Sequence, residues 1–229
     1  MAAPRTYRSR TPRSGRRHAA GTNRARCEGT VSDSTHTQRK RRLGARDAIA
    51  VALATWAGVG FLPGAPGTWA SLCVIVIFVL FSPFALVGWA IGCAVVTALG
   101  VWASGRAEQV FNRSDDGRIV IDEIAGQGIA LLPLAGTPMF ATTLPPAITP
   151  GEQLIVGVVT AFVAFRCFDI WKPGPIRRAD RGEWSIGEAW GSDMRNGVSV
   201  MLDDVLAGLA AAVVVIVCLI ALSTVGGLL

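Results

Sequence analysis

Four apolar stretches, each long enough for a membrane-spanning helix, constrain the fold of this chain more than any other feature. A helix needs about 20 apolar residues to cross the hydrocarbon core of a bilayer. The stretches that meet this length are residues 84–103, 124–142, 152–171 and 205–225. A fifth stretch, residues 69–82, is shorter and could be a short span or a re-entrant arm. The sequence therefore predicts an all-α, polytopic helical membrane protein with four or five membrane helices.

The charges divide the chain into two parts. Residues 1–46 contain 13 of the 22 Lys and Arg residues but only 2 of the 16 Asp and Glu residues, and they have no apolar run. This composition predicts a disordered basic cytoplasmic tail, either a solvated arm or a contact with anionic lipid. Residues 47–229, the expected helical membrane domain, have more acidic than basic groups. A nucleic-acid-binding function is therefore excluded for the domain, because such a face needs an excess of cations.

The distribution of Lys and Arg also predicts the topology. Positively charged loops stay on the cytoplasmic side of a membrane. If residues 69–103 form one helical hairpin and residues 124–171 a second, the tail and the loops 104–118 and 172–200 all lie on one side. We therefore expect the Gly/Pro-rich loop, residues 58–67, and the charged helix ends to share the cytoplasmic face.

Five carboxylates stand at the predicted cytoplasmic ends of the apolar stretches. They are Asp122, Glu123, Asp169, Asp203 and Asp204. Acidic groups at such positions are costly to desolvate, so they usually pair, face a cavity or bind a cation. One interpretation is a structural salt-bridge network, and helix capping could explain Asp122 or Asp203 alone. The other is a divalent-metal site, and oxygen ligands without His or Cys suit Mg²⁺.

Cations accompany these carboxylates. Arg166 and Asp169 are three residues apart and share a helical face, and Lys172 follows just before Pro173 stops the helix. Arg166, Asp169 and Lys172 could together bind a metal ion and a phosphate group. Arg166 and Asp169 could equally form a plain ion pair. Thr68 could cap the next helix, whose free N–H groups could hold an oxyanion.

Several phosphatase chemistries are excluded by the residues present. Both histidines, His18 and His36, lie in the tail, so the membrane domain has no histidine for catalysis or zinc binding. No Cys is followed six positions later by Arg, and no DxDxT segment occurs. A metal-activated water is the hydrolytic route that remains.

Four segments together resemble the phosphatidylglycerophosphatase A family of bacterial membrane enzymes. They are GVGFLPGAPGTWAS (Gly58–Ser71), IDEIAGQG (Ile121–Gly128), FRCFDIWKPGPI (Phe165–Ile176) and VMLDDVLAGLAA (Val200–Ala211). The resemblance covers about residues 50–220 and leaves the tail outside. Ala70 stands where family members often have Gly, and the linker 182–199 is longer than usual. Neither departure removes a charged motif residue.

The resemblance implies a phosphatase of the bacterial cell (inner) membrane, with its active site at the cytoplasmic face. This enzyme would use Mg²⁺ to convert the membrane lipid phosphatidylglycerophosphate to phosphatidylglycerol in phospholipid biosynthesis. It places the five carboxylates on Mg²⁺ or its waters, as the catalytic and metal-binding set. The phosphate and head group would be bound by Arg166, Lys172, Arg177 and Thr68. Two other classes stay open from the residues alone: a small-ion or proton transporter using intramembrane carboxylates, and a non-enzymatic membrane scaffold.

Overall fold

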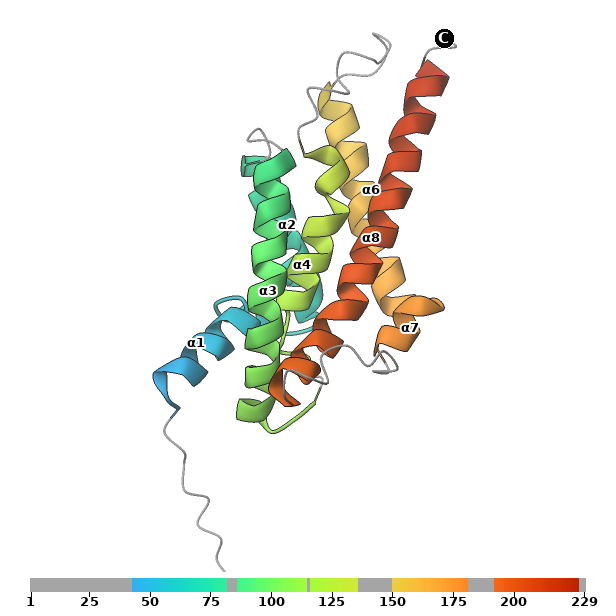
Figure 1. Ribbon diagram of the computed structural model, residues 1–229. Helices are drawn as coiled ribbons and strands as arrows, with labels where there is room; N and C mark the ends of the chain where they lie inside the picture. The colour runs from blue at the N-terminus through green and yellow to red at the C-terminus, as the bar shows by residue number, and fades with distance from the viewer. Residues whose placement is uncertain (1–42, 82–85, 115, 136–149, 181–191, 227–229) are drawn as a thin grey trace, which may run out of the picture. The chain divides into compact units, whose positions relative to one another are not determined.

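The chain forms a bundle of helices, seen in the computed structural model (Figure 1). The structure describes residues 43–81, 86–114, 116–135, 150–180 and 192–226. The helices are α1 (Ala45–Ala54), α2 (Pro66–Phe81), α3 (Leu86–Phe111), α4 (Ile121–Ala130), α6 (Pro150–Trp171), α7 (Pro175–Asp180) and α8 (Ser192–Gly226), with 3₁₀ turns η1 (Val59–Phe61) and η3 (Leu132–Leu134). The described residues contain no strand, which confirms the all-α class. The predictions for residues 1–42 of the tail fall outside the described residues.

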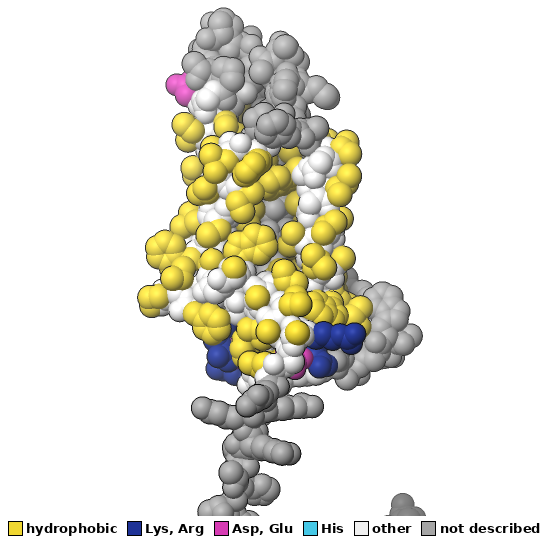
Figure 2. All heavy atoms as spheres, turned by 90° about the vertical axis from the view of Figure 1, so that its left-hand side faces the viewer, with side chains coloured by type: hydrophobic (Ala, Val, Ile, Leu, Met, Phe, Trp, Pro, Cys, Tyr) yellow, Lys and Arg dark blue, Asp and Glu magenta, His cyan; other side chains and the backbone are white. Residues whose placement is uncertain are grey.

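Three helices are long and apolar enough to cross a membrane, judged over the described residues. They cover Leu86–Phe111, Gly151–Trp171 and Asn196–Thr224, and α2 is a shorter apolar helix. Hydrophobic side chains cover most of the described surface, and Lys and Arg gather at one end of the face shown in Figure 2. Exposed apolar side chains along several helices are what lipid contact requires. The chain is therefore a helical membrane protein, as predicted.

Three helix boundaries differ from the prediction. The helix α3 continues through Phe111 rather than ending at residue 103, and α8 begins at Ser192 rather than residue 205. Hydropathy marks only the part of a helix that lies in lipid, whereas these polar extensions are helical because they pack against α1 and against each other. The stretch 124–142 is not one helix either, because α4 ends at Ala130 and η3 follows.

The short helix α4 lies at the centre of the bundle and packs against α2, α3, α6 and α8. All its residues from Ile124 to Ala130 are buried. The crossing of α4 with α8 is close because both helices have glycine there. A Cβ on Gly126 would meet the backbone of Asp204, and a Cβ on Gly208 would meet the carbonyl of Gly126. Glycines at such a crossing let two backbones approach closely. This crossing brings the acidic start of α4 beside α8.

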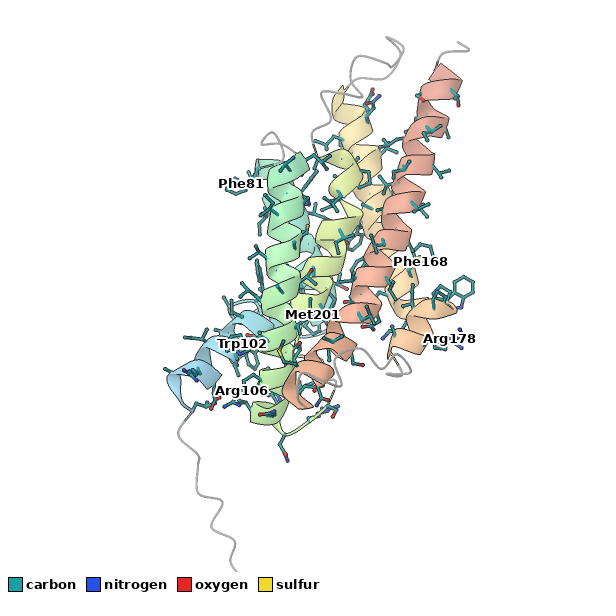
Figure 3. All side chains as sticks on the ribbon, in the orientation of Figure 1. Phe81, Trp102, Arg106, Phe168, Arg178 and Met201 are labelled. Atoms are coloured by element: carbon teal, nitrogen blue, oxygen red, sulfur yellow. The ribbon has the colours of Figure 1, made fainter. Side chains whose placement is uncertain are left out.

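The helices α3 and α8 also cross closely. A Cβ on Gly197 would clash with the carbonyl of Val101, and one on Gly100 would meet the side chain of Met201, labelled in Figure 3. The polar first turns of α8 are thereby held against the C-terminal half of α3. Beside them Arg106 Nε donates to Asp47 Oδ1 over 2.8 Å, which ties α1 to α3.

The loop between α1 and α2 packs against the segment before α4. The backbone N–H of Val120 donates to the carbonyl of Ala54 over 2.8 Å. A Cβ on Gly60 would clash with the carbonyl of Arg118, so only glycine fits at this close approach. The loop is thereby fixed beside the first turn of α4.

Candidate metal and phosphate site

An acidic cavity of about 320 Å³ lies where the first turn of α4 meets the end of α6 and the polar part of α8. All five carboxylates singled out from the sequence line it, together with Lys172. They are Asp122, Glu123, Asp169, Asp203 and Asp204. The chain brings them together from three helices that are far apart in sequence. Asp203 and Asp204 lie inside α8 and not at its start, because α8 begins at Ser192.

Three of these carboxylates form a compact cluster. One oxygen each from Asp122, Glu123 and Asp204 lies within 4.8 Å of the others. Asp122 does not cap α4, whose N-cap position is Val120. Its Oδ1 accepts a hydrogen bond from the backbone N–H of Glu123 over 3.0 Å. Glu123 Oε2 is buried and has no hydrogen-bond partner among the described residues.

These features fit a bound divalent cation. A buried carboxylate oxygen without a partner is costly, and a cation among the three side chains would remove that cost. The donor set contains only hard oxygen atoms, which Mg²⁺ prefers. We call Asp122, Glu123 and Asp204 the carboxylate cluster.

The start of α2 holds the Glu123 side chain in place. A Cβ on the buried Gly67 would clash with Glu123 Oε1. The absence of a side chain at Gly67 is therefore what allows the Glu123 carboxylate to lie against α2. The first turn of α2 thus limits the space that is available to the Glu123 side chain.

The other two predicted carboxylates form ion pairs. Arg166 Nη1 lies 2.9 Å from Asp169 Oδ2, three residues along the same helix. Lys172 Nζ donates to Asp203 Oδ2 over 2.7 Å and joins the end of α6 to α8. Lys172 has a φ of 43°, a left-handed conformation that is uncommon for a residue other than glycine. Asp169 and Asp203 thus form the ion pairs that one of the two interpretations expects, and their binding to a metal ion stays a prediction.

Two residues expected at the site occupy other surroundings. Thr68 is not the cap of α2, because that helix begins at Pro66, where proline is favoured in the first turn. Its backbone N–H donates to the carbonyl of Ala65 over 3.0 Å, so this N–H is not free to hold an oxyanion. Arg177 lies exposed on α7, and its Nη2 is 3.5 Å from the carbonyl oxygen of Trp171. Neither residue lines the acidic cavity, and Arg166 is not among the lining residues either, although its partner Asp169 is.

Sequence reasoning missed other polar residues of the cavity. Glu108 and Asp116 line it and are buried. Asp116 accepts two hydrogen bonds of 2.7 Å from the Arg118 guanidinium, which hold the pKa of Asp116 below its usual value. The Arg118 guanidinium also lies 3.9 Å from the Phe111 ring centroid. The sequence signal, a polar DDGR turn, was indistinguishable from an ordinary solvated loop.

Comparisons with known proteins identify the family of the chain. A sequence model of the family described as phosphatidylglycerophosphatase A matches residues 52–219. The proteins named phosphatidylglycerophosphatase A from Haemophilus influenzae and Escherichia coli (strain K12) are 32% and 31% identical. These matches cover 71% and 70% of this chain, and 84% and 77% of those proteins.

A protein of Bacteroides thetaiotaomicron named "Putative phosphatidylinositol-3-phosphatase" is 31% identical over 174 residues. That match covers 74% of this chain and 92% of the other. No solved structure matches the chain.

Proposed function

The chain belongs to the phosphatidylglycerophosphatase A family and is a phosphoric monoester hydrolase, and from this premise we propose that it hydrolyses phosphatidylglycerophosphate to phosphatidylglycerol and phosphate. The observation that carries the proposal is the carboxylate cluster, which lines a polar cavity in an otherwise apolar bundle. A lipid phosphatase needs this combination, because its substrate has a charged head group and a body that stays in the membrane. This reaction is a step of phospholipid biosynthesis.

We propose that Asp122, Glu123 and Asp204 hold Mg²⁺. When bound there, the ion would neutralise the phosphoryl oxygens and favour deprotonation of an attacking water. The orphaned oxygen of Glu123 supports this assignment. The three carboxylates by themselves offer a phosphate no positive charge, so we expect the acidic cavity to bind the substrate phosphate only when the cation is present.

The paired cations are proposed to bind the substrate phosphate. Lys172 lines the cavity and is held there by Asp203, and Arg166 is oriented by Asp169. Hydrogen bonds between a guanidinium or ammonium and a phosphate are among the stronger ones in proteins. Asp169 and Asp203 would then act by positioning these cations beside the cluster. Arg177, exposed on α7, would meet the anionic head group outside the cavity.

Phosphate release by the purified protein in lipid nanodiscs tests the function. Phosphatidylglycerophosphate should be hydrolysed, and phosphatidylinositol 3-phosphate, suggested by the name of the Bacteroides relative, should be tested beside it. A higher kcat/KM for the inositol lipid would reverse the substrate assignment. Ion or proton flux into sealed liposomes that contain the protein, without phosphate release, would favour the transporter alternative. The absence of both activities would favour a scaffold.

We further propose that the acidic cavity faces the cytoplasm of a bacterial inner membrane. Ser114, near the cavity end of α3, and Thr224, near the end of α8, are exposed residues at opposite ends of the bundle. In a variant without native cysteines, Thr224→Cys should react with a membrane-impermeant maleimide added to intact spheroplasts. Ser114→Cys should react only after the membrane is opened. Labelling of Ser114→Cys in intact spheroplasts would place the cavity on the outer face.

Replacing Gly67 by alanine should lower kcat about a hundredfold while the protein stays folded. The new Cβ would displace the Glu123 carboxylate, and this neighbour is the end of a flexible side chain rather than backbone. Phosphate release per folded molecule, with the folded fraction taken from size-exclusion chromatography, measures the effect. Adding Glu123→Asp, which shortens the acid by one methylene, should recover part of the activity. A Gly67→Ala variant with full activity would show that the close approach of α2 to the Glu123 carboxylate is not required for catalysis.

A further inference from the structure

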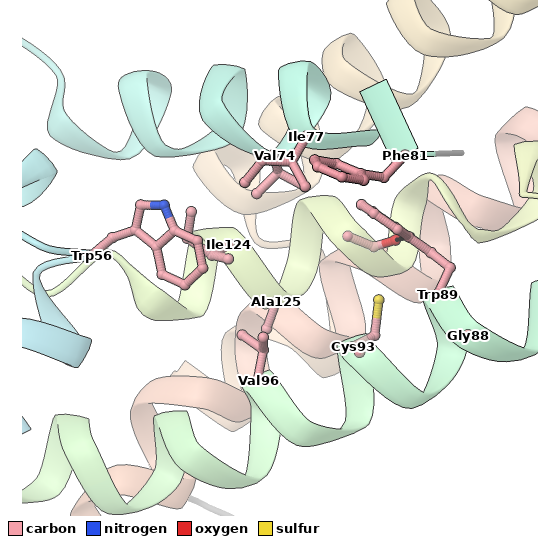
Figure 4. A pocket seen from close by; sticks show the side chains of 12 residues that line it. Trp56, Val74, Ile77, Phe81, Gly88, Trp89, Cys93, Val96, Ile124 and Ala125 are labelled. Atoms are coloured by element: carbon pink, nitrogen blue, oxygen red, sulfur yellow. Dashed lines mark hydrogen bonds between the residues drawn. The ribbon is translucent and has the colours of Figure 1, made fainter. Parts of the chain in front are cut away.

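A buried glutamine on α4 lacks the hydrogen bonds that its side chain can make. Gln127 is fully buried, and neither Nε2 nor Oε1 of its amide has a hydrogen-bond partner among the described residues. A buried amide without a partner costs free energy, so such a group calls for a structural or functional reason. Gln127 lines neither the acidic cavity nor the cavity of about 500 Å³ between α2, α3 and α4 that Figure 4 shows. Neighbouring side chains are therefore the partners to consider.

A serine on α2 has the same feature. The Ser71 side chain is fully buried, and its Oγ has no hydrogen-bond partner among the described residues. Two other hydroxyls inside helices donate to the carbonyl four residues earlier: Ser104 Oγ donates to Gly100 over 2.6 Å, and Thr97 Oγ1 donates to Cys93 over 2.8 Å. Ser71 does not make this local bond, so its hydroxyl is available to a group on another helix.

Gln127 and Ser71 each follow, by one helical turn, a residue of the close approach between α2 and α4. Gln127 is four residues after Glu123, and Ser71 is four residues after Gly67, whose Cβ would clash with the Glu123 carboxylate. Residues four apart share a face of a helix. The helices α2 and α4 pack against each other, and both run from the acidic cavity toward the opposite end of the bundle (Figure 1). We therefore expect the side chains of Ser71 and Gln127 to lie at the same level.

The hydrogen-bonding groups of these side chains match in one order. An ionised carboxylate only accepts hydrogen bonds, an amide nitrogen only donates, and a hydroxyl does both. Gln127 Nε2 would therefore donate to the Glu123 carboxylate, and Gln127 Oε1 would accept from the Ser71 hydroxyl. The Cβ atoms of residues four apart on a helix are about 5–6 Å apart, a distance that two long side chains can span. A carboxylate has about four lone-pair sites, so Glu123 can accept this bond and hold a cation together.

We propose that Gln127 is a positioning residue that fixes the Glu123 carboxylate for the metal ion, and that Ser71 holds the Gln127 amide in the required orientation. The inference rests on the proposed function, in which Glu123 holds Mg²⁺. Side chains that ligate metals are in turn held by hydrogen bonds, and the loss of such a partner costs about 10–100-fold in metal affinity or activity. The buried amide of Gln127 thus has a role that an apolar side chain of the same size could not fill.

The test measures Mg²⁺ binding without substrate, from the rise of Tm with Mg²⁺ concentration in detergent-purified protein. Gln127→Met keeps the approximate side-chain volume and removes the amide. It should raise the Kd for Mg²⁺ about tenfold, while the Tm without Mg²⁺ stays the same or rises, because a buried amide without a partner is gone. Gln153→Met makes the same change near the start of α6, on a buried glutamine whose Nε2 also has no partner among the described residues. This control should leave the Kd unchanged.

Two further variants separate positioning from core filling. Ser71→Ala removes one hydroxyl and should raise the Kd for Mg²⁺ about threefold, and it decides the question should Gln127→Met fail to fold. Added to Glu123→Gln, Gln127→Met should raise the Kd by much less than its own tenfold effect, because both changes act through one carboxylate.

An unchanged Kd in Gln127→Met, or a full tenfold effect added to that of Glu123→Gln, would make Gln127 a core residue only and overturn the proposal. If Gln127→Met does not fold, an unchanged Kd in Ser71→Ala has the same consequence. Weaker Mg²⁺ binding by Gln127→Met, in a protein that hydrolyses no phosphatidylglycerophosphate, would support the positioning role and refute only the proposed function. A wild-type Tm that does not respond to Mg²⁺ would refute both the positioning role and the metal site.

Discussion

Removal of divalent cations should lower phosphate release from phosphatidylglycerophosphate at least about a thousandfold, equal to about 4 kcal/mol of transition-state stabilisation. The reason is electrostatic: the carboxylate cluster places three acidic side chains within 4.8 Å of one another, and a divalent cation held by them would neutralise the charge of the phosphoryl group. Protein in nanodiscs would be dialysed against EDTA and then titrated with Mg²⁺, which should restore the rate. Ca²⁺ should substitute poorly, because it prefers longer distances and more ligands.

A matched pair of substitutions separates a ligand effect from a general loss of acidic charge. Glu123→Gln keeps the side-chain shape, and it should raise the Mg²⁺ concentration for half-maximal activity at least about tenfold and lower kcat. Glu152→Gln makes the same chemical change near the opposite end of α6 and should leave both quantities unchanged. Full activity after exhaustive chelation, with the same Mg²⁺ dependence in both variants, would require a mechanism without a metal.

The class of fold followed from hydropathy because the physical demand is simple. A segment that stays in lipid must satisfy its own backbone hydrogen bonds, so long apolar stretches become helices. Where the helices end was less predictable. Residues 104–111 carry polar and charged side chains and resemble a loop, yet Ser104 and Glu108 are buried within α3 against neighbouring helices. The packing that makes this segment helical involves residues distant in sequence.

The grouping of the acidic residues was also predictable, because the distribution of Lys and Arg assigned the helix ends that carry them to the same side of the membrane. Their division into a cluster and two ion pairs was not. Lys172 and Asp203 are far apart in sequence and meet because α6 ends where α8 passes. The contact between Gly67 and Glu123 depends on how the start of α2 packs against α4. The cavity of about 500 Å³ lined mainly by apolar residues of α2, α3 and α4 is likewise a space between three helices, and no periodic pattern in the sequence predicts it.

Asp204→Asn should lower kcat about a thousandfold at an unchanged folded fraction, whereas Asp169→Asn should lower kcat/KM only about tenfold. Asp204 belongs to the carboxylate cluster, and asparagine removes one negative charge with almost no change of shape. Asp169 pairs with Arg166, so its loss should loosen a phosphate-binding cation and act mainly through KM. Steady-state kinetics on both variants, normalised to folded protein from size-exclusion chromatography, measure these effects.

The Arg166→Lys variant provides the control for this comparison, because it keeps the charge but loses the planar, two-pronged geometry of arginine. It should resemble Asp169→Asn, and combining the two should cost less than the product of the single effects, since both disturb one ion pair. A loss of kcat in Asp169→Asn as large as in Asp204→Asn would make Asp169 a fourth metal ligand. Its ion pair with Arg166 would then have to open when the cation binds. Full kcat in Asp204→Asn would remove α8 from the metal site altogether.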